Sequence, residues 1–529
     1  MRTVAASLAT LALAVPALAS TSQGNPTRKP YVCSDALQHL ITEKDIRAGA
    51  QKLQDIADAN QGTRVFGSTG HNATVDFLYN TLKDTGYYDV YKQPFTETYS
   101  AGTGSLSVNG KEIDVQIMTY TTAGTATGPI VYAEGLGCTA ADYPAEAAGN
   151  IVLVSRGECT FGAKSLAAKE AGAVGLLIYN NVPGSLSGTL GEAFKDYAPV
   201  LGVSQEDATA LIASIKAGEE VNAEFEVDAI TEPRVSFNVI AETKGGDHNN
   251  VLVVGGHSDS VAAGPGINDD GSGIIGILTV AKALTNFNVK NAVRFGFWSA
   301  EEFGLLGSEY YVKSLNGSET ELAKIRAYLN FDMVCFPCCD CQSKMKTMLT
   351  VKKQIASPNY VYGIYDGDGS AFNLTGPQGS DVIEKDFEQF FKKAKVASVP
   401  SEFSGRSDYA AFIENGIPSG GIFTGAEGIK TEEEAAAIGG TAGISYDVNY
   451  HKAGDDINNI AWDAFLLNTK AIANSVAKYA RSFKSLPAIN LMQRRWDGDV
   501  AQTLKRNKKR ANEAHTHSHS GPCGGGEEI

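Results

Sequence analysis

The stretch from Val251 to Gly273, VLVVGGHSDSVAAGPGINDDGSG, decides the fold of this chain. It opens with an apolar run that is typical of a buried strand, and His257 follows directly after that run. Two adjacent carboxylates, Asp269 and Asp270, then stand in a glycine-rich turn before an apolar helical pattern. A strand, a polar turn and a helix in this order indicate an α/β domain with its functional side chains at the carboxyl ends of the strands.

The same alternation continues toward the C-terminus. Strand patterns cover residues 292–298 and 327–331, and a helical pattern covers residues 305–315. We therefore expect an α/β fold whose mixed, largely parallel sheet carries helices on both faces. Nearer the N-terminus, the patterns predict helices over 34–53 and 73–85 and a strand over 90–108.

Length and composition exclude several classes of protein. A chain of 529 residues corresponds to about three domains, so it can bury a large core. The formal net charge is −15 and the pI is about 5.1, which argues against a nucleic-acid partner. With 43% hydrophobic and 20% charged residues, the composition is that of a globular protein.

The N-terminus has the pattern of a secretory signal peptide. Arg2 precedes an apolar stretch, and Ala17-Leu18-Ala19 offers the small residues at which such peptides are cut, which predicts a signal over residues 1–19. The apolar stretch is too short to span a bilayer comfortably, so we expect no membrane anchor and a location outside the cell or in the vacuole lumen. Three sequons are glycosylation candidates, at Asn72, Asn316 and Asn373.

Residues 126–232 differ from the neighbouring sequence in composition and hydrophobic pattern. They contain short Val/Ile/Leu runs with frequent glycine and the motif Ser155-Arg156-Gly157-Glu158-Cys159-Thr160-Phe161. This stretch resembles the protease-associated (PA) domain, a small non-catalytic α/β insert. Cys138 and Cys159 are predicted to pair, while Cys33 and Cys523 are too isolated to assign.

The insert separates residues 20–125 from residues 233–490, which together are predicted to form one peptidase domain. Residues 491–529 form a basic, histidine-rich tail that cannot build a core.

The residues that carry chemistry recur at the ends of predicted strands. They are His257 and Asp259 after the first strand, Asp269 in the following turn, Glu301 and Glu302 after the second, Asp332 after the third, and His451 in a later loop. Each has a structural alternative, because such residues also serve as helix caps, solvated turns and loop histidines. Their common edge favours a catalytic zinc site, since open zinc sites use imidazole and carboxylate ligands.

These motifs resemble the co-catalytic di-zinc aminopeptidases of metallopeptidase clan MH, in particular the fungal secreted leucine aminopeptidases and their vacuolar relatives, which carry a PA insert. The resemblance covers roughly residues 30 to 490. It implies two Zn²⁺ ions per chain. One would be bound by His257 and Asp332, the other by Glu302 and His451, with Asp269 bridging them and a hydroxide between the metals.

The resemblance also implies roles for other residues. Glu301 would be the general base, Tyr450 would donate to the developing oxyanion, and Asp259 would orient the imidazole of His257. Arg406 lies in a stretch that would hold the α-ammonium group of the substrate, with a structural ion pair as the alternative. The expected enzyme is a monomeric aminopeptidase that removes leucine and other large or basic residues from peptides with a free N-terminus.

The resemblance stops for 21 residues, from Val334 to Gln354, and resumes at Ile355. Four cysteines crowd into this segment, yet they lack the two separated ligand pairs of a zinc knuckle. The segment is compatible with a translated in-frame intron, because Val334-Cys335 can be encoded by GTATGT and Gln354 by CAG. It begins two residues after Asp332, so we expect the chain that contains it to bind its second metal poorly and to be inactive or misfolded, unless the segment loops out of the fold.

The sequence is also compatible with two other functions. Receptor-like proteins combine the same two domains without a working metal site, but here every ligand and Glu301 are present. Carboxypeptidases and glutaminyl cyclases share the fold class. A carboxypeptidase would need a basic cluster for the terminal carboxylate of its substrate, and no distinctive one stands near these motifs.

Overall fold

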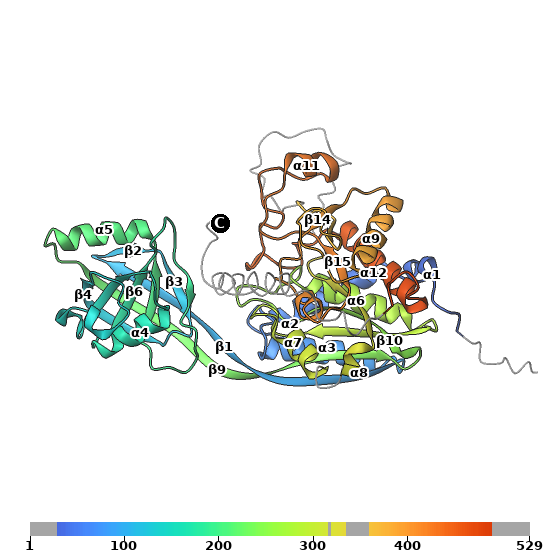
Figure 1. Cartoon of the computed structure of the whole chain (residues 1–529), viewed down its shortest axis with the longest axis horizontal. Helices are drawn as coiled ribbons and strands as arrows, with labels where there is room; N and C mark the ends of the chain where they lie inside the picture. Colours follow the sequence, from blue (N-terminus) through green and yellow to red (C-terminus); the bar gives the residue numbers. More distant parts are fainter. Residues whose placement is uncertain (1–28, 316–318, 335–358, 489–529) are drawn as a thin grey trace, which may run out of the picture.

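The structure, a computed structural model, describes residues 29–315, 319–334 and 359–488 (Figure 1). The predicted signal peptide, the sequon at Asn316, residues 335–354 of the anomalous segment and the predicted tail from 491 onward lie outside the described residues. In the described part, no helix combines the length and the apolar character needed to cross a bilayer.

A mixed sheet forms the centre of the larger part of the molecule (Figure 1). Its strands lie in the order β14-β13-β15-β12-β10-β11-β9, and β1 pairs with β9 at the edge. The pairs β15/β12, β12/β10 and β10/β11 are parallel, and the pairs β11/β9 and β9/β1 are antiparallel. The bounds are β14 Val399–Ser401, β13 Gly363–Tyr365, β15 Ser419–Phe423, β12 Ile325–Phe331, β10 Asp247–His257, β11 Asn291–Trp298, β9 Asn222–Thr243 and β1 Tyr88–Val108.

Helices cover both faces of this sheet, as predicted. Successive residues of β10 point to opposite faces, so Leu252 and Val254 belong to one buried cluster while Val251 and Val253 belong to another. The first cluster is closed by α1 Ser34–His39, α2 Glu43–Asp58, α3 Thr69–Lys83, α6 Gly271–Leu284, α9 Ser380–Ala394 and α12 Trp462–Arg481. The second is closed by α7 Leu306–Leu315, α8 Glu319–Ala323 and α10 Tyr409–Ile413.

The single helix predicted over residues 34–53 is wrong. The structure has two helices there, α1 and α2, because Thr42 starts a new helix: its hydroxyl accepts the backbone N–H of Asp45 at 3.3 Å. The helices predicted over 73–85 and 305–315 correspond to α3 and α7, with ends shifted by a few residues, and the apolar helical pattern predicted after Asp270 corresponds to α6.

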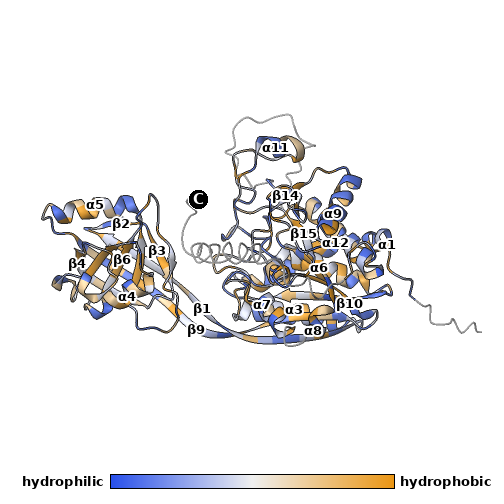
Figure 2. Ribbon diagram, viewed as in Figure 1, coloured by the Kyte–Doolittle hydropathy of each residue, from blue (hydrophilic) through white to orange (hydrophobic). Residues whose placement is uncertain are grey.

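The PA region is a separate α/β unit at the end of a long two-stranded ribbon. Strands β1 and β9 pair along their whole length and extend from the central sheet into this unit (Figure 1). Cys138 and Cys159, the predicted pair, form a disulfide with Cα atoms 5.8 Å apart. Figure 2 shows apolar residues concentrated in the strands of the unit and hydrophilic residues on α5. Its elements are β2 Lys111–Ile113, β3 Val115–Thr119, β4 Gly124–Tyr132, β5 Ile151–Ser155, α4 Phe161–Glu170, β6 Gly175–Tyr179, β7 Gly188–Thr189, β8 Val200–Val203 and α5 Gln205–Lys216.

The chain is firmly held up to the start of the anomalous segment. Val334 is fully buried in the core cluster, its backbone N–H donates to Ser272 Oγ at 2.8 Å, and its carbonyl accepts from Asn468 Nδ2 at 2.9 Å. Asp332, two residues earlier, therefore has a defined position beside the sheet.

Candidate metal centre

Three neighbouring parallel strands deliver the predicted ligands to one edge of the sheet. His257 is the last residue of β10, Glu301 and Glu302 follow β11, and Asp332 follows β12. Because these strands are parallel and adjacent, their carboxyl ends meet at the same edge. His451 reaches this edge from the loop that precedes α12.

The carboxylate of Asp269 lies between the two imidazoles. Its Oδ1 atom is 3.1 Å from His257 Nε2, and its Oδ2 atom is 3.2 Å from His451 Nε2. All three side chains are buried. Each oxygen of this carboxylate thus faces a different histidine, as a ligand shared by two metal ions requires.

Further carboxylates complete the surroundings of each imidazole. Asp332 Oδ1 is 3.7 Å from His257 Nε2, and Asp332 Oδ2 accepts a hydrogen bond of 2.6 Å from Ser407 Oγ. On the other side, Glu302 Oε2 is 2.9 Å from His451 Nε2. The structure therefore brings together all five residues predicted as metal ligands.

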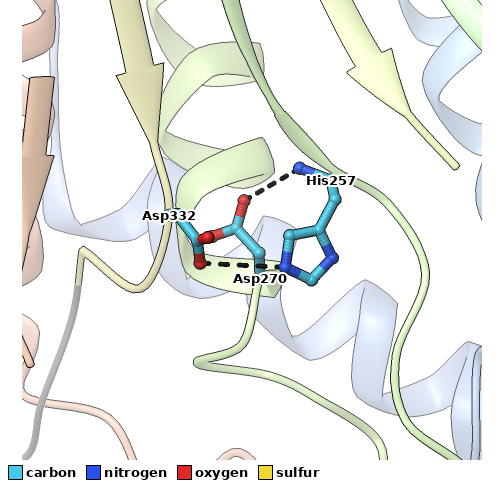
Figure 3. Close-up of side chains that lie close together, drawn as sticks. All are labelled: His257, Asp270 and Asp332. Atoms are coloured by element: carbon cyan, nitrogen blue, oxygen red, sulfur yellow. Dashed lines mark hydrogen bonds and ion pairs between the residues drawn. The ribbon is translucent and has the colours of Figure 1, made fainter. Parts of the chain in front are cut away.

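Asp270 has a structural role in the same cluster. Its Oδ1 atom accepts the backbone N–H groups of Gly273 and Met333, and its Oδ2 atom accepts that of His257 at 3.1 Å. Figure 3 shows Asp270 and Asp332 side by side, with the Asp332 carboxylate directed at the imidazole of His257. Asp270 is the N-cap of α6, and it ties the ends of β10 and β12 to the start of that helix.

The pKa values of these groups reflect the strongly negative charge of the site. Burial alone would lower the pKa of His257, but the carboxylates of Glu301, Asp259, Asp269 and Asp332 outweigh it and raise the pKa well above its usual value. Likewise, Glu302 and Asp269 overcome burial and raise the pKa of His451 to about 10. Burial raises the pKa values of Glu301 and Glu302. Protons therefore occupy this cluster in the metal-free protein, where cations would replace them.

The donor set fits zinc. With bonds of about 2.0–2.1 Å, two ligand atoms on a tetrahedral zinc ion lie about 3.3 Å apart. The separations of 2.9 to 3.7 Å between imidazole nitrogens and carboxylate oxygens are close to that value. Glu302 Oε1 is buried and has no hydrogen-bond partner among the described residues, which also suits a metal ligand.

The carboxylate of Asp259 faces the Nδ1 atom of the His257 imidazole, and its role in orienting that ring stays a prediction. Its Oδ1 atom is 3.6 Å from His257 Nδ1, on the side of the ring away from Asp269, and it accepts the backbone N–H of Glu301 at 3.2 Å. One buried carboxylate thus contacts both a predicted ligand and the backbone of the predicted general base. Glu301 Oε2 itself is 3.8 Å from His257 Nε2.

Tyr450 and Arg406 lie beside the cluster. The ring of Tyr450 stacks on that of His451 with centroids 3.8 Å apart, and Arg406 Nη2 donates to Tyr450 Oη at 3.4 Å. Burial raises the pKa of Tyr450 well above its usual value, so the phenol keeps its proton. Arg406 Nη1 pairs with Glu427 Oε1 at 2.5 Å, which is the structural alternative for this residue, and its contact with substrate stays a prediction.

A second acidic group, Asp366, Asp368 and Glu384, is of a different kind. Asp366 accepts the backbone N–H groups of Ser370, Ala371 and Phe372. Glu384 accepts those of Gly367 and Asp368. These carboxylates hold a loop together and lack a histidine.

Sequence reasoning missed two buried residues that contact the loop carrying Asp269, namely Arg64 and Asp455. Arg64 stands in a polar segment before α3, and Asp455 follows His451 by four residues. Neither ends a predicted strand. The only sequence signal for Asp455 was that this charged residue stands close to the motif containing His451. The sequence around Arg64 gave no signal of a role at the site.

Two family models match the chain. Peptidase family M28 matches residues 238–476, and the PA domain matches residues 126–211. The probable leucine aminopeptidase 2 of Aspergillus fumigatus is 51% identical over 500 residues, covering 94% of this chain and 93% of that protein. Leucine aminopeptidase 2 of Trichophyton rubrum is 51% identical over 461 residues, covering 87% and 88%.

Solved structures give the same picture. An aminopeptidase from Aneurinibacillus sp. strain AM-1 aligns with a TM-score of 0.62 at 25% identity, covering 87% of this chain and 99% of that one. BSAP, a zinc aminopeptidase from Bacillus subtilis, aligns with a TM-score of 0.57 at 25% identity, covering 84% and 96%.

Proposed function

The chain belongs to peptidase family M28 and is a metallo-aminopeptidase, and on that premise we propose that it releases the N-terminal residue of peptides with two zinc ions bound around Asp269. The observation that carries the proposal is the position of this carboxylate, with one oxygen 3.1 Å from His257 and the other 3.2 Å from His451. We assign His257 and Asp332 to one ion and Glu302 and His451 to the other.

Bound zinc would lower the pKa of a water molecule and polarise the scissile carbonyl group. Glu301 would take the proton of that water. Its carboxyl is buried beside His257, and burial raises its pKa, so it can hold a proton and return it to the leaving amine. The bond between Asp259 and the backbone N–H of Glu301 fixes its position.

Tyr450 would stabilise the charge that develops on the carbonyl oxygen. Its phenol is protonated and stands beside the predicted ligand His451, so its O–H can donate to that oxygen. The acidic cluster would also attract the free α-ammonium group of a substrate. This attraction makes the centre suited to an aminopeptidase rather than to an enzyme that recognises a terminal carboxylate.

Several finer features belong to the same proposal. Leucine and other large or basic residues would be preferred, as the names of the fungal relatives suggest for leucine. The protein would be secreted or delivered to the vacuole lumen, where the Cys138–Cys159 disulfide would be stable. Asn72 and Asn373 are exposed and could be glycosylated there. A mature chain that begins at Ser20 would support this route, and a retained Met1 would contradict it.

The test compares leucine p-nitroanilide with its N-acetylated form, each with and without a zinc chelator. It is run on the 529-residue chain and on a chain without residues 334–354, and the more active form becomes the reference for the variants below. We expect chelator-sensitive hydrolysis of the free-amine substrate only. If neither zinc-loaded form hydrolyses the free-amine substrate, the result would favour a receptor-like function without catalysis. Equal hydrolysis of the acetylated substrate would rule out an aminopeptidase.

A further inference from the structure

The loop from Ser258 to Asn268 joins two predicted metal ligands, His257 and Asp269, without forming a helix or strand. It is nevertheless almost wholly buried; only Ala262 and Ala263 are partly exposed. Buried backbone groups need hydrogen-bond partners, and this loop cannot supply them through regular secondary structure. Ser260 Oγ contacts two carbonyls from within the loop, those of Val261 and Gly264, and other partners come from elsewhere in the chain.

Arg64 supplies donors to three of the loop carbonyl groups. Its guanidinium donates from Nη1 to the carbonyl of Ser258 at 2.5 Å, from Nε to that of Pro265 at 2.8 Å and from Nη2 to that of Gly266 at 2.6 Å. The side chain is 0% exposed. A single planar group therefore holds both ends of the loop. The backbone N–H of Arg64 also donates to Ser260 Oγ at 2.9 Å.

Asp455 accepts the amide groups at the C-terminal end of the loop and that of Asp269. Its carboxylate accepts the backbone N–H of Asn268 at 2.9 Å and that of Asp269 at 3.0 Å. Its own carbonyl accepts the N–H of Ile267 at 3.0 Å. Since Asp455 lies four residues after His451, this contact links the loop to the segment that carries the other histidine.

The charge of Arg64 suits this place. Burial lowers its pKa, but the carboxylates of Asp259, Asp455, Asp270 and Asp269 counteract that effect, and a guanidinium stays protonated in proteins. The cation lies behind the metal-binding loop, where it offsets part of the negative charge of the cluster. It donates to backbone carbonyls, so the carboxylate oxygens that face the imidazoles stay available to metal.

We propose that Arg64 is a positioning residue of the metal centre, which holds the Ser258–Asn268 loop so that His257 and Asp269 can bind the same zinc ion. The inference rests on the proposed two-zinc function. A lysine could not replace the planar guanidinium group of Arg64, because its single ammonium group cannot reach all three carbonyls that surround the guanidinium. A methionine would remove the Arg64 donors from the buried carbonyls of Ser258 and Pro265 and would leave that of Gly266 with the backbone N–H of Gly271.

The test measures zinc binding by metal-free protein in competition with a fluorescent zinc chelator, alongside thermal melting. Arg64→Met and Arg64→Lys are compared with Arg326→Met. Arg326 also donates to a backbone carbonyl, that of Pro487 at 3.0 Å, but it lies at the start of β12, opposite the metal centre. We expect both Arg64 variants to bind zinc about 10- to 100-fold more weakly, as for other residues that orient metal ligands, and excess zinc to restore part of kcat.

Zinc affinities of the Arg64 variants equal to that of Arg326→Met would overturn the proposal. If Arg64→Met does not fold, Arg64→Lys decides, because it keeps the charge and most of the volume. Loss of the fold in both would also contradict the proposal, since Arg64 would then support the whole domain. If the reference protein binds two zinc ions but hydrolyses no peptide, the proposed function fails while this inference stands.

Discussion

Replacing Glu301 by glutamine isolates the proton-transfer step from metal binding. Glutamine has nearly the same shape, and the backbone N–H of residue 301 would still donate to Asp259, so the side chain should keep its place. The glutamine resembles the protonated carboxyl that burial favours, yet it cannot accept a proton. The ligand set around Asp269 stays intact, because Glu301 is not among the five predicted ligands.

Loss of a general base costs about 10²- to 10⁴-fold in rate, which corresponds to about 3 to 5 kcal/mol in activation free energy. We expect Glu301→Gln to lower kcat for leucine p-nitroanilide by this factor, with zinc content unchanged and KM changed little. Glu384→Gln is the matched control, since Glu384 is another buried glutamate of the same domain, bonded only to loop amides in the contacts described above. A kcat within about threefold of the reference would refute the role of Glu301, and so would a loss that merely follows loss of zinc.

Three further results are expected. Asp269→Asn keeps one oxygen for one metal, so it should reduce zinc content from two ions to one per chain; two tightly bound ions in this variant would contradict the bridging role. In metal-free protein, protonated His451 forms ion pairs that stabilise the fold. This stabilisation is complete below the unfolded pKa of 6.5 and is lost as pH rises through the folded pKa of about 10. Tm should therefore decrease between these two pH values, and saturating zinc should abolish that decrease. Deleting residues 334–354 places Ile355 at the buried position that Val334 occupies, so Tm should not decrease. The activity of the shortened chain should be higher than that of the 529-residue chain. A lower Tm would show that the segment supports the fold.

The sheet and most of its helices could be predicted because their signals are local. The strands β10, β11 and β12 are short apolar runs, and parallel strands buried on both faces must be apolar throughout. The ligands at the ends of these strands followed from the same pattern, since the carboxyl ends of parallel strands lie at one edge. His451 comes from a loop, so no strand pattern fixed its position, and its assignment to a particular metal ion came from the resemblance to a known family.

The contacts that position the site could not be predicted in the same way. Arg64 and Asp455 stand outside any strand or helix pattern in the sequence. They contact the loop that carries Asp269 across sequence separations of 194 and 186 residues, respectively. The break between α1 and α2 depends on the competition between Thr42 as a cap and the continuing apolar pattern. The partner of Arg406, Glu427, lies in a distant loop with no pattern of its own.

Zinc stoichiometry tests most directly whether Asp269 joins two zinc ions in one buried cluster. Metal-free protein would be titrated with zinc while bound metal and hydrolysis of leucine p-nitroanilide are followed together. We predict two zinc ions per chain at full activity, with one ion per chain in Asp269→Asn. Full activity with a single bound ion, or two ions bound equally well without the Asp269 carboxylate, would contradict the account.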